Sequence, residues 1–263
     1  MAKKSSADEA GRLSGTQSIE RALTLMREIA AHNRTGSRLL DLAARTGLQR
    51  PTVHRMLKCL ATENMVLQDP DSHRYYLGSM VFELGLTAAP RFNLRDICHP
   101  AMNRIADATG DTVFLTQRSG MDSVCVDRQE GTFPIKTFTL EIGMRRPLGV
   151  GTGSLAILAA LSDEEVRRVV TANAPRLPDY GLTPTSLLAQ VKRAQKLGYA
   201  VREMPSLAGV RSIGHALHNH GGTAFAALSL SAISSRMTEK RVAELATLLR
   251  NEARLVDKQI ASR

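Results

Sequence analysis

The sequence has little of what marks secreted, membrane-bound or disulfide-stabilised proteins. Its 263 residues include no tryptophan and only three cysteines, Cys59, Cys98 and Cys125, with no CxxC spacing. An odd number of cysteines without that spacing is typical of a reduced cytoplasmic protein. No apolar run approaches the roughly 18–20 residues of a membrane-spanning helix, so we expect no membrane partner. The opening MAKKSSADEAGRLSG has two lysines but no apolar stretch behind them, which argues against a signal peptide.

The motifs of common catalytic sites are also missing. The sequence contains no HExxH motif, and no carboxylate pair stands out. Gly149, Gly151 and Gly153 fall at every second position and therefore do not fit the GxGxxG pattern of dinucleotide-binding folds. Ser154 is followed by Leu155 and does not fit GxSxG. We therefore expect a protein that is not an enzyme and that needs no cofactor.

The glycine-rich loop at 149–154 has two remaining interpretations. It precedes a predicted helix, and the start of a helix offers free N–H groups and the positive end of a dipole, which favour an anion. Alternatively, the loop is a packing turn that requires small residues. The sequence alone leaves both interpretations open.

Positive charge is abundant but is spread over the whole chain. The formal net charge is +10 and the estimated pI is about 10, which favours a polyanionic partner. Residues 1–90 carry 12 Lys/Arg against 9 Asp/Glu, and the remaining residues carry 23 against 16. The local distribution of charge is therefore more informative than the total.

The most informative segment is 39–77, which reads LLDLAARTGLQRPTVHRMLKCLATENMVLQDPDSHRYYL. Two helical patterns meet at Gly47, and the second has no acidic residue before Thr62. A short strand, a turn and a second strand follow. This layout is typical of a winged helix-turn-helix, which places one helix in the major groove of DNA.

The remaining chain divides into further segments. We expect a disordered arm over 1–16, the winged helix-turn-helix over 17–77, a linker helix over 78–94 and a second domain over 95–263. In the second domain helices are mixed with strands, among them a candidate strand at Pro134–Leu140. This order favours an α+β fold with an antiparallel sheet.

The chain from about residue 17 resembles the IclR family of bacterial transcriptional regulators. The resemblance rests on SIERALTLMREIA, LLDLAARTGLQRPTVHRMLKCL, RYYLGSMVFELG, RRPLGVGTGSLAILAAL and GVRSIGHALHNHGGTAFAALSLSA. It implies an N-terminal winged helix-turn-helix, a linker helix used in dimerisation and a C-terminal GAF-like domain that binds a small effector. It also implies a homodimer or a dimer of dimers on a palindromic operator of double-stranded DNA.

The third predicted helix supplies most of the candidate DNA contacts. Side chains near the start of such a helix reach base edges, where Arg can bind guanine and Gln can bind adenine. Arg55 could instead be held in an ion pair by Asp41 or Glu63. The candidates for base or backbone contacts are Gln49, Arg50, Thr52, His54, Arg55 and Lys58. The candidates for phosphate contacts are Arg21, Arg38, His73 and Arg74.

The resemblance also implies an effector pocket in the second domain, where a small organic acid would contact the glycine-rich loop. Ser229 and Ser231 are two residues apart, so both hydroxyls should lie on one face of a strand. Many family members have an acidic pair where this chain has Arg202 and Glu203, and a cation in the pocket would favour an anionic effector. The implied pocket residues are Thr152, Gly153, Arg202 (or Glu203), Ser212, Leu228, Ser229 and Ser231.

Three functions stay open at this point: a ligand-responsive DNA-binding regulator, a ligand-independent DNA-binding protein, and an enzyme with a DNA-binding appendage. The missing catalytic set argues against the enzyme. His215, His218 and His220 could bind a metal. However, strand alternation places His215 and His218 on opposite faces, so we expect no metal site.

Overall fold

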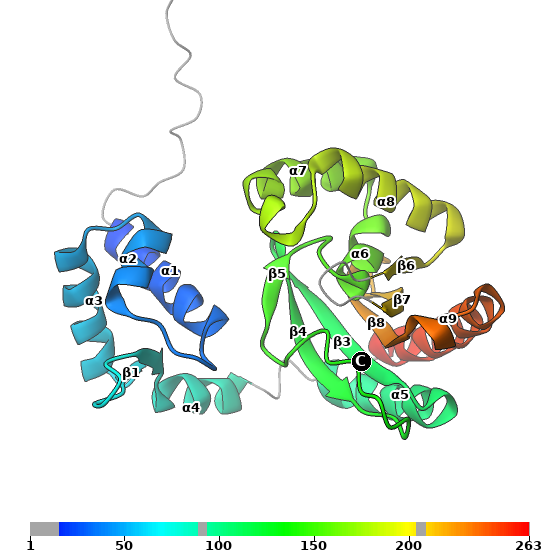
Figure 1. The fold of residues 1–263 in the computed structure, drawn as a ribbon, viewed down its shortest axis with the longest axis horizontal. Helices are drawn as coiled ribbons and strands as arrows, with labels where there is room; N and C mark the ends of the chain where they lie inside the picture. The colour runs from blue at the N-terminus through cyan, green and yellow to red at the C-terminus, as the bar shows by residue number, and fades with distance from the viewer. Residues whose placement is uncertain (1–15, 89–93, 204–208, 263) are drawn as a thin grey trace, which may run out of the picture. The chain divides into compact units, whose positions relative to one another are not determined.

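The computed structural model describes residues 16–88, 94–203 and 209–262. The chain divides into two compact units, Met1–Arg91 and Phe92–Arg263 (Figure 1). The expected disordered arm at 1–16 lies outside the described residues, except for Thr16. Within the described residues, no helix is both long and apolar enough to cross a membrane.

The first unit is built on three helices, α1 (Gln17–Ala31), α2 (Leu39–Thr46) and α3 (Arg50–Thr62). Gly47 ends α2 in the left-handed conformation, with φ 67°, and so allows the sharp turn into α3. Pro51 lies in the first turn of α3, where its missing N–H costs no helical hydrogen bond. The fully buried residues of the core are Leu25, Ile29, Leu42, Val53 and Leu57.

A short hairpin forms the wing. Strands β1 (Val66–Gln68) and β2 (Tyr75–Leu77) pair antiparallel. In the turn between them, a carboxylate oxygen of Asp69 accepts hydrogen bonds from the hydroxyl and the N–H of Ser72, at 2.6 and 2.7 Å. These hydrogen bonds lower the pKa of Asp69 below its ordinary value. The turn is therefore fixed by its own side chains, and His73 adopts a left-handed conformation within it.

Helix α4 (Ser79–Ala88) begins directly after the wing. Its start is attached to the turn after α3, because Gly78 N–H donates to the carbonyl oxygen of Met65 at 2.9 Å and Met80 N–H donates to that of Asn64 at 3.1 Å. A Cβ atom at Gly78 would overlap the Asn64 carbonyl group, so only glycine fits there. None of the residues of α4 is buried within the chain. Its exposed apolar side chains are Phe82, Leu84 and Leu86.

The second unit contains a six-stranded antiparallel sheet with the order β5-β4-β3-β8-β7-β6. The first two strands of this sheet along the chain, β3 and β4, form a hairpin that makes up one half of the sheet together with β5. The final long strand, β8, lies between β3 and β7 and so joins the two halves. The strands are β3 (Thr112–Ser119), β4 (Asp122–Gln129), β5 (Arg145–Pro147), β6 (Ala200–Glu203), β7 (Val210–His218) and β8 (Ala224–Ile233).

Helices cover both faces of this sheet (Figure 1). Helices α5 (Leu94–Thr109) and α9 (Glu239–Ala261) pack on one face, together with Leu228 and Leu230 of β8. Helix α6 (Thr152–Ala159) packs on the other face with α7 (Asp163–Asn173) and α8 (Pro184–Leu197) behind it. Three short 3-10 helices lie at Ala174–Arg176, Pro178–Tyr180 and Ser234–Arg236. Because strand residues alternate between faces, Ser229 and Ser231 lie on the α6 face.

The segment 131–144 is a strap without strand structure, so the expected strand at Pro134–Leu140 is wrong. The segment does alternate, but Thr137 and Thr139 are buried whereas Ile135 and Phe138 are exposed. The Thr137 hydroxyl donates to the carbonyl oxygen of Ser231 at 2.7 Å. A side chain, and not a strand ladder, therefore attaches the strap to β8.

Candidate functional site

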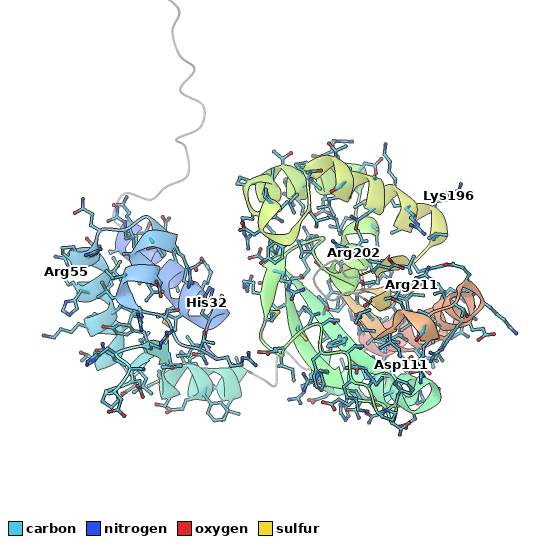
Figure 2. The ribbon with its side chains drawn as sticks, in the orientation of Figure 1. His32, Arg55, Asp111, Lys196, Arg202 and Arg211 are labelled. Carbon is cyan, nitrogen blue, oxygen red and sulfur yellow. The ribbon has the colours of Figure 1, made fainter. Side chains whose placement is uncertain are left out.

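The outward side of α3 is positively charged and free of acidic residues. Val53 and Leu57 turn into the core, whereas His54, Arg55 and Lys58 are exposed. Figure 2 labels Arg55 on the outer side of this helix. Gln49 is the N-terminal cap residue and is exposed with Arg50, and Thr52 is half-buried. The helix thus presents polar and basic side chains along one stripe, as a helix that enters a groove of DNA requires.

The side chain of Arg55 is available for a contact with DNA. Among the residues that the structure describes, it forms no ion pair with Asp41 or Glu63. Its guanidinium group is therefore free to meet an external anion. The contact with DNA remains a prediction.

The four predicted phosphate ligands have different surroundings. Arg38 precedes α2 and is exposed, as is His73 in the wing, and Arg21 is half-buried on α1. Arg74 is engaged within the protein, because its Nη1 atom donates to the carbonyl oxygens of Thr35 at 3.2 Å and Gly36 at 3.0 Å. These bonds give Arg74 a structural role, holding the wing to the turn between α1 and α2, which the sequence did not indicate.

In the second unit, buried hydroxyl groups gather where the glycine-rich loop meets the sheet. The Oγ1 atoms of Thr152, at the start of α6, and Thr116, on β3, are buried without a hydrogen-bond partner among the described residues. A Cβ atom at Gly153 would lie 2.9 Å from Thr116 Oγ1 and 3.1 Å from Ser229 Oγ, so these residues meet closely. An unsatisfied buried hydroxyl costs about 1–3 kcal/mol. Two of them beside a helix N-terminus indicate a ligand site.

A second row of hydroxyls continues from this point along the same face of the sheet. Ser212 Oγ and Ser231 Oγ lie 2.7 Å apart and are both buried. Thr139 Oγ1, from the strap, lies 3.4 Å from Ser231 Oγ. The predicted residues Ser212 and Ser231 are therefore direct neighbours.

Two arginines border this row of hydroxyls. Arg202 on β6 is the register partner of Ser212 on β7. Arg146 on β5 donates from Nη2 to the carbonyl oxygen of Thr139 at 3.2 Å. Burial lowers the pKa of both guanidinium groups, and the charge of Arg146 lowers the pKa of Arg202 further. The two cations are thus close enough to repel one another.

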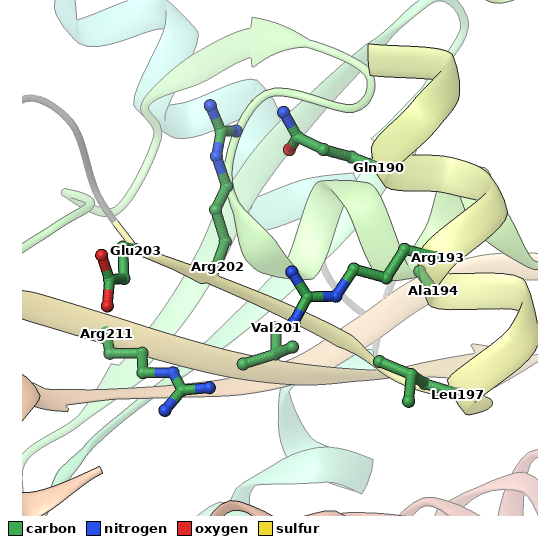
Figure 3. Close-up of a pocket in the computed structure, with 8 residues that line it drawn as sticks. All are labelled: Gln190, Arg193, Ala194, Leu197, Val201, Arg202, Glu203 and Arg211. Atoms are coloured by element: carbon green, nitrogen blue, oxygen red, sulfur yellow. The ribbon is translucent and has the colours of Figure 1, made fainter. Parts of the chain in front are cut away.

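The orientation of Arg202 is visible in Figure 3. Its side chain points from β6 towards Gln190 of α8 and borders a cavity of about 290 Å³. Glu203, the alternative to Arg202, also borders this cavity but is exposed, and as the next residue along the strand it lies on the other face of the sheet from Ser212. Of the two alternatives, Arg202 is the one that belongs to this face.

Leu228 does not belong to the site, and the prediction for it is wrong. Its side chain is fully buried in the core formed with α5 and α9, on the face opposite to Ser229. Consecutive residues of a strand point to opposite faces, so Leu228 and Ser229 cannot both face one pocket.

The expected separation of His215 and His218 is also wrong. The β7–β8 ladder shifts register between Leu217 and His218, where β8 has one extra residue, Phe225, and both histidines border one cavity of about 270 Å³ at the edge of the sheet. His218 is bonded to Asp257, with 3.1 Å between its Nδ1 atom and Oδ2 of the carboxylate. Within the described ranges, no group of three or more His, Cys, Asp or Glu is arranged to hold a metal ion.

Protonation of His215 is expected to destabilise the second unit. Burial lowers its pKa from the ordinary value of 6.5, although its hydrogen bond to the Ala216 carbonyl oxygen opposes the shift; His218 and Arg250 lower the pKa further, and Asp257 raises it. The unfolded chain therefore binds the proton more readily, so stability is complete above about pH 6.5 and is lost as pH falls towards the folded pKa. Melting curves from pH 7.5 to 5.0 should fall less steeply for His215→Gln than for the native chain. Equal slopes would contradict this expectation.

Two residues of the site were missed by the sequence reasoning. Thr116 lies in an ordinary strand pattern, and nothing in its neighbours distinguishes it. Arg146 belongs to the quoted motif RRPLGVGTGSLAILAAL, but its approach to β8 depends on the strap, whose path the sequence did not indicate. Arg146 forms no ion pair with any described carboxylate, and this sign of a binding site can be seen only in a structure.

Both units match models of known protein families. The family model described as "Bacterial transcriptional regulator IclR C-terminal" matches residues 86–258, and "IclR helix-turn-helix domain" matches residues 18–70. The HTH-type transcriptional repressor AllR of Escherichia coli strain K12 is 27% identical over 242 residues, which cover 91% of this chain and 89% of AllR.

Solved structures share the fold. An IclR-type regulator from Silicibacter sp. TM1040 matches with a TM-score of 0.79 and 22% identity, covering 93% of this chain and 96% of that one. An IclR homologue from Microbacterium hydrocarbonoxydans, in complex with 4-hydroxybenzoate, matches with a TM-score of 0.71 and 20% identity, covering 94% and 100%.

Proposed function

Since the chain belongs to the IclR family of bacterial transcriptional regulators, we propose that its DNA binding is controlled by a small organic anion. The first unit is the DNA-binding part, and the second takes the anion between α6 and the sheet. We further propose that it acts in the cytoplasm on a palindromic operator, as a homodimer or a dimer of dimers.

One observation carries the effector proposal. The face of the sheet under α6 combines two buried hydroxyls without partners, on Thr116 and Thr152, with the cationic side chains of Arg146 and Arg202. Such a site is unsatisfied without a ligand and favours one with negative charge. The homologue in complex with 4-hydroxybenzoate supports the proposal by similarity of fold.

The competing functions are less well supported. The curated relatives that match are transcriptional regulators, which fits a protein that is not an enzyme. A ligand-independent DNA-binding protein would have no reason to bury hydroxyls and cations without partners, because packed apolar side chains would be more stable there.

The coupling between the two activities requires an oligomer. DNA half-sites for a helix-turn-helix dimer lie about 34–36 Å apart, and a small change in the spacing of the two α3 helices would weaken binding to both. We propose that the anion changes this spacing through the α4 segment, which connects the DNA-binding part to the rest of the chain.

Helix α4 is expected to form the contact between subunits, because none of the described residues of its unit covers its apolar side chains. Phe82 and Leu86 are one turn apart and are 68% and 58% exposed. A chain with Phe82→Asp and Leu86→Asp should be smaller in solution than the native oligomer, as measured by size exclusion with light scattering. The substitution Glu83→Gln on the same helix serves as the control and should leave the mass unchanged. An unchanged mass for the double variant would refute the role of α4.

The proposed function is tested with the DNA that flanks the protein's own gene. We expect selective binding that weakens steeply with salt, since contacts with phosphates release counterions. A thermal-shift screen of small organic acids then identifies compounds that bind, and these should alter the affinity for DNA. Selective binding with no response to any acid would favour the ligand-independent alternative, whereas no selective binding would refute the regulator.

A further inference from the structure

The proposed effector site contains more positive charge than one carboxylate would balance. Arg146 and Arg202 are both half-buried, and neither forms an ion pair with any residue that the structure describes. Most other buried or half-buried arginines of the second unit are paired; Arg241, for example, lies 2.7 Å from the carboxylate of Asp111. The two arginines are therefore exceptions that require an explanation.

Within the described ranges, no carboxylate pairs with either arginine. The segment that follows β6 in the sequence reads MPSLA at 204–208 and contains no acidic residue. Glu203 precedes it and borders the same cavity as Arg202, but it is exposed and forms no ion pair with Arg202. Arg211 lines the same cavity as Arg202 and is already paired with Glu239 at 2.7 Å. Among the described residues, the charge of Arg146 and of Arg202 is therefore not balanced by a carboxylate.

The two guanidinium groups lie at opposite ends of one polar row. Arg146 binds the backbone of Thr139, whose hydroxyl faces Ser231 at 3.4 Å. Ser231 bonds to Ser212 at 2.7 Å, and Ser212 is the register partner of Arg202. The hydroxyls between the arginines can donate hydrogen bonds to, or accept them from, a polar molecule that spans the row.

Burying two like charges beside one another is unfavourable, and it persists only where a function compensates for it. Desolvation lowers the pKa of both arginines, and their mutual repulsion adds to the effect on Arg202. A ligand with one negative group would relieve one cation and leave the other unpaired. A ligand with two negative groups would pair both and would remove the repulsion between them.

We propose that the effector is a small organic dianion, with one acidic group held by Arg146 and the α6 N-terminus and the other by Arg202. The inference rests on the proposed function and specifies the chemical class of its ligand. Thr116 and Thr152, whose hydroxyls lack partners, would bind oxygen atoms of the first group. Gln190 borders the same cavity as Arg202, and its side-chain amide can donate a hydrogen bond from Nε2 to the second group (Figure 3).

The test compares dicarboxylates with monocarboxylates of equal carbon number. Malonate to adipate and the benzene dicarboxylates are titrated into the full-length protein by calorimetry, each beside its matched monoacid, with a phosphorylated and a sulfonated carboxylic acid as further ligands that carry two acidic groups. At least one dianion is expected to bind 10-fold or more tightly than its matched monoanion. Equal affinities, tighter binding of the monoanions, or binding of none of these dianions would overturn the proposal.

Variants identify the two cations. Arg146→Gln and Arg202→Gln should each reduce the affinity for the best dianion at least 10-fold and bring it close to that of the matched monoanion. Lys196→Gln removes one positive charge from the exposed end of α8 and should change the affinity less than 2-fold. Without ligand, the melting temperature of Arg202→Gln should equal or exceed that of the native chain, because a repelled cation has been removed. A merely structural arginine would instead lower it.

The outcome separates this inference from the proposed function. A monocarboxylate that binds as tightly as any dianion, and that alters DNA binding, would preserve the regulator and refute the dianion. If no acid of either kind binds, the anion-responsive part of the proposed function is refuted as well. Selective DNA binding, measured separately, would still stand.

Discussion

A chain with Arg50→Ala and Arg55→Ala is expected to lose selective DNA binding. Both residues are exposed on α3, and Arg55 has no ion pair among the described residues, so the substitutions leave the fold intact. Good base contacts are worth about 1–3 kcal/mol each and add roughly at separate positions. The double variant should therefore bind its operator roughly 30-fold to more than 10,000-fold more weakly, as measured by fluorescence anisotropy at fixed salt.

A charge-matched control distinguishes recognition from general attraction. Arg27→Ala with Arg45→Ala removes the same charge from exposed positions on α1 and α2. This control should weaken selective and non-selective DNA binding alike and by a smaller factor. If both double variants lose affinity equally, and without loss of selectivity, α3 is not the reading helix.

Filling the space at the start of α6 is expected to abolish the response to the effector. Gly153 lies so close to the sheet that even a Cβ atom would approach Thr116 Oγ1 to 2.9 Å and Ser229 Oγ to 3.1 Å. In Gly153→Val, further methyl groups would occupy the site where the buried hydroxyls meet. The strain should reduce stability by about 1–3 kcal/mol. Affinity for the acid with the largest thermal shift should fall by at least about 100-fold, or about 2.7 kcal/mol.

DNA binding provides the internal control for this variant. Gly153→Val should still bind the operator selectively, because the first unit has its own core, but added acid should no longer alter the binding. Gly221→Val, in the exposed turn before β8, changes another glycine of the same unit and should retain a normal response. A normal response in Gly153→Val would exclude this location for the effector.

Sequence reasoning predicted the helix-turn-helix well because its signals are local. The turn at Gly47, the proline at the start of α3 and the apolar spacing of Val53 and Leu57 depend on residues a few positions apart. Most helices and strands of the second unit also depend on such local signals. The Leu228 error has a similar origin, since the two-residue period that groups Ser229 with Ser231 already excludes Leu228 from their face.

The parts that could not be predicted depend on contacts between distant residues. The strap at 131–144 shows strand-like alternation, but it buries threonines and not apolar side chains, because its partner is a polar row on β8. The position of Arg146 follows from that path. The register shift at the end of β7 comes from one extra residue on β8, Phe225, which no pattern in the HALHNH segment reveals, and His218 borders the same cavity as His215 there.

The attachment of α4 to the turn after α3 has a mechanical consequence. Backbone hydrogen bonds at Gly78 and Met80, and the lack of room for any Cβ atom at Gly78, leave no flexible joint between the wing and this helix. The reading helix cannot be turned relative to α4 without breaking these bonds. A movement of α4 must therefore move the whole first unit with it as a rigid body. The length of α4 then sets how far a small rotation at its far end displaces the side chains that meet the bases.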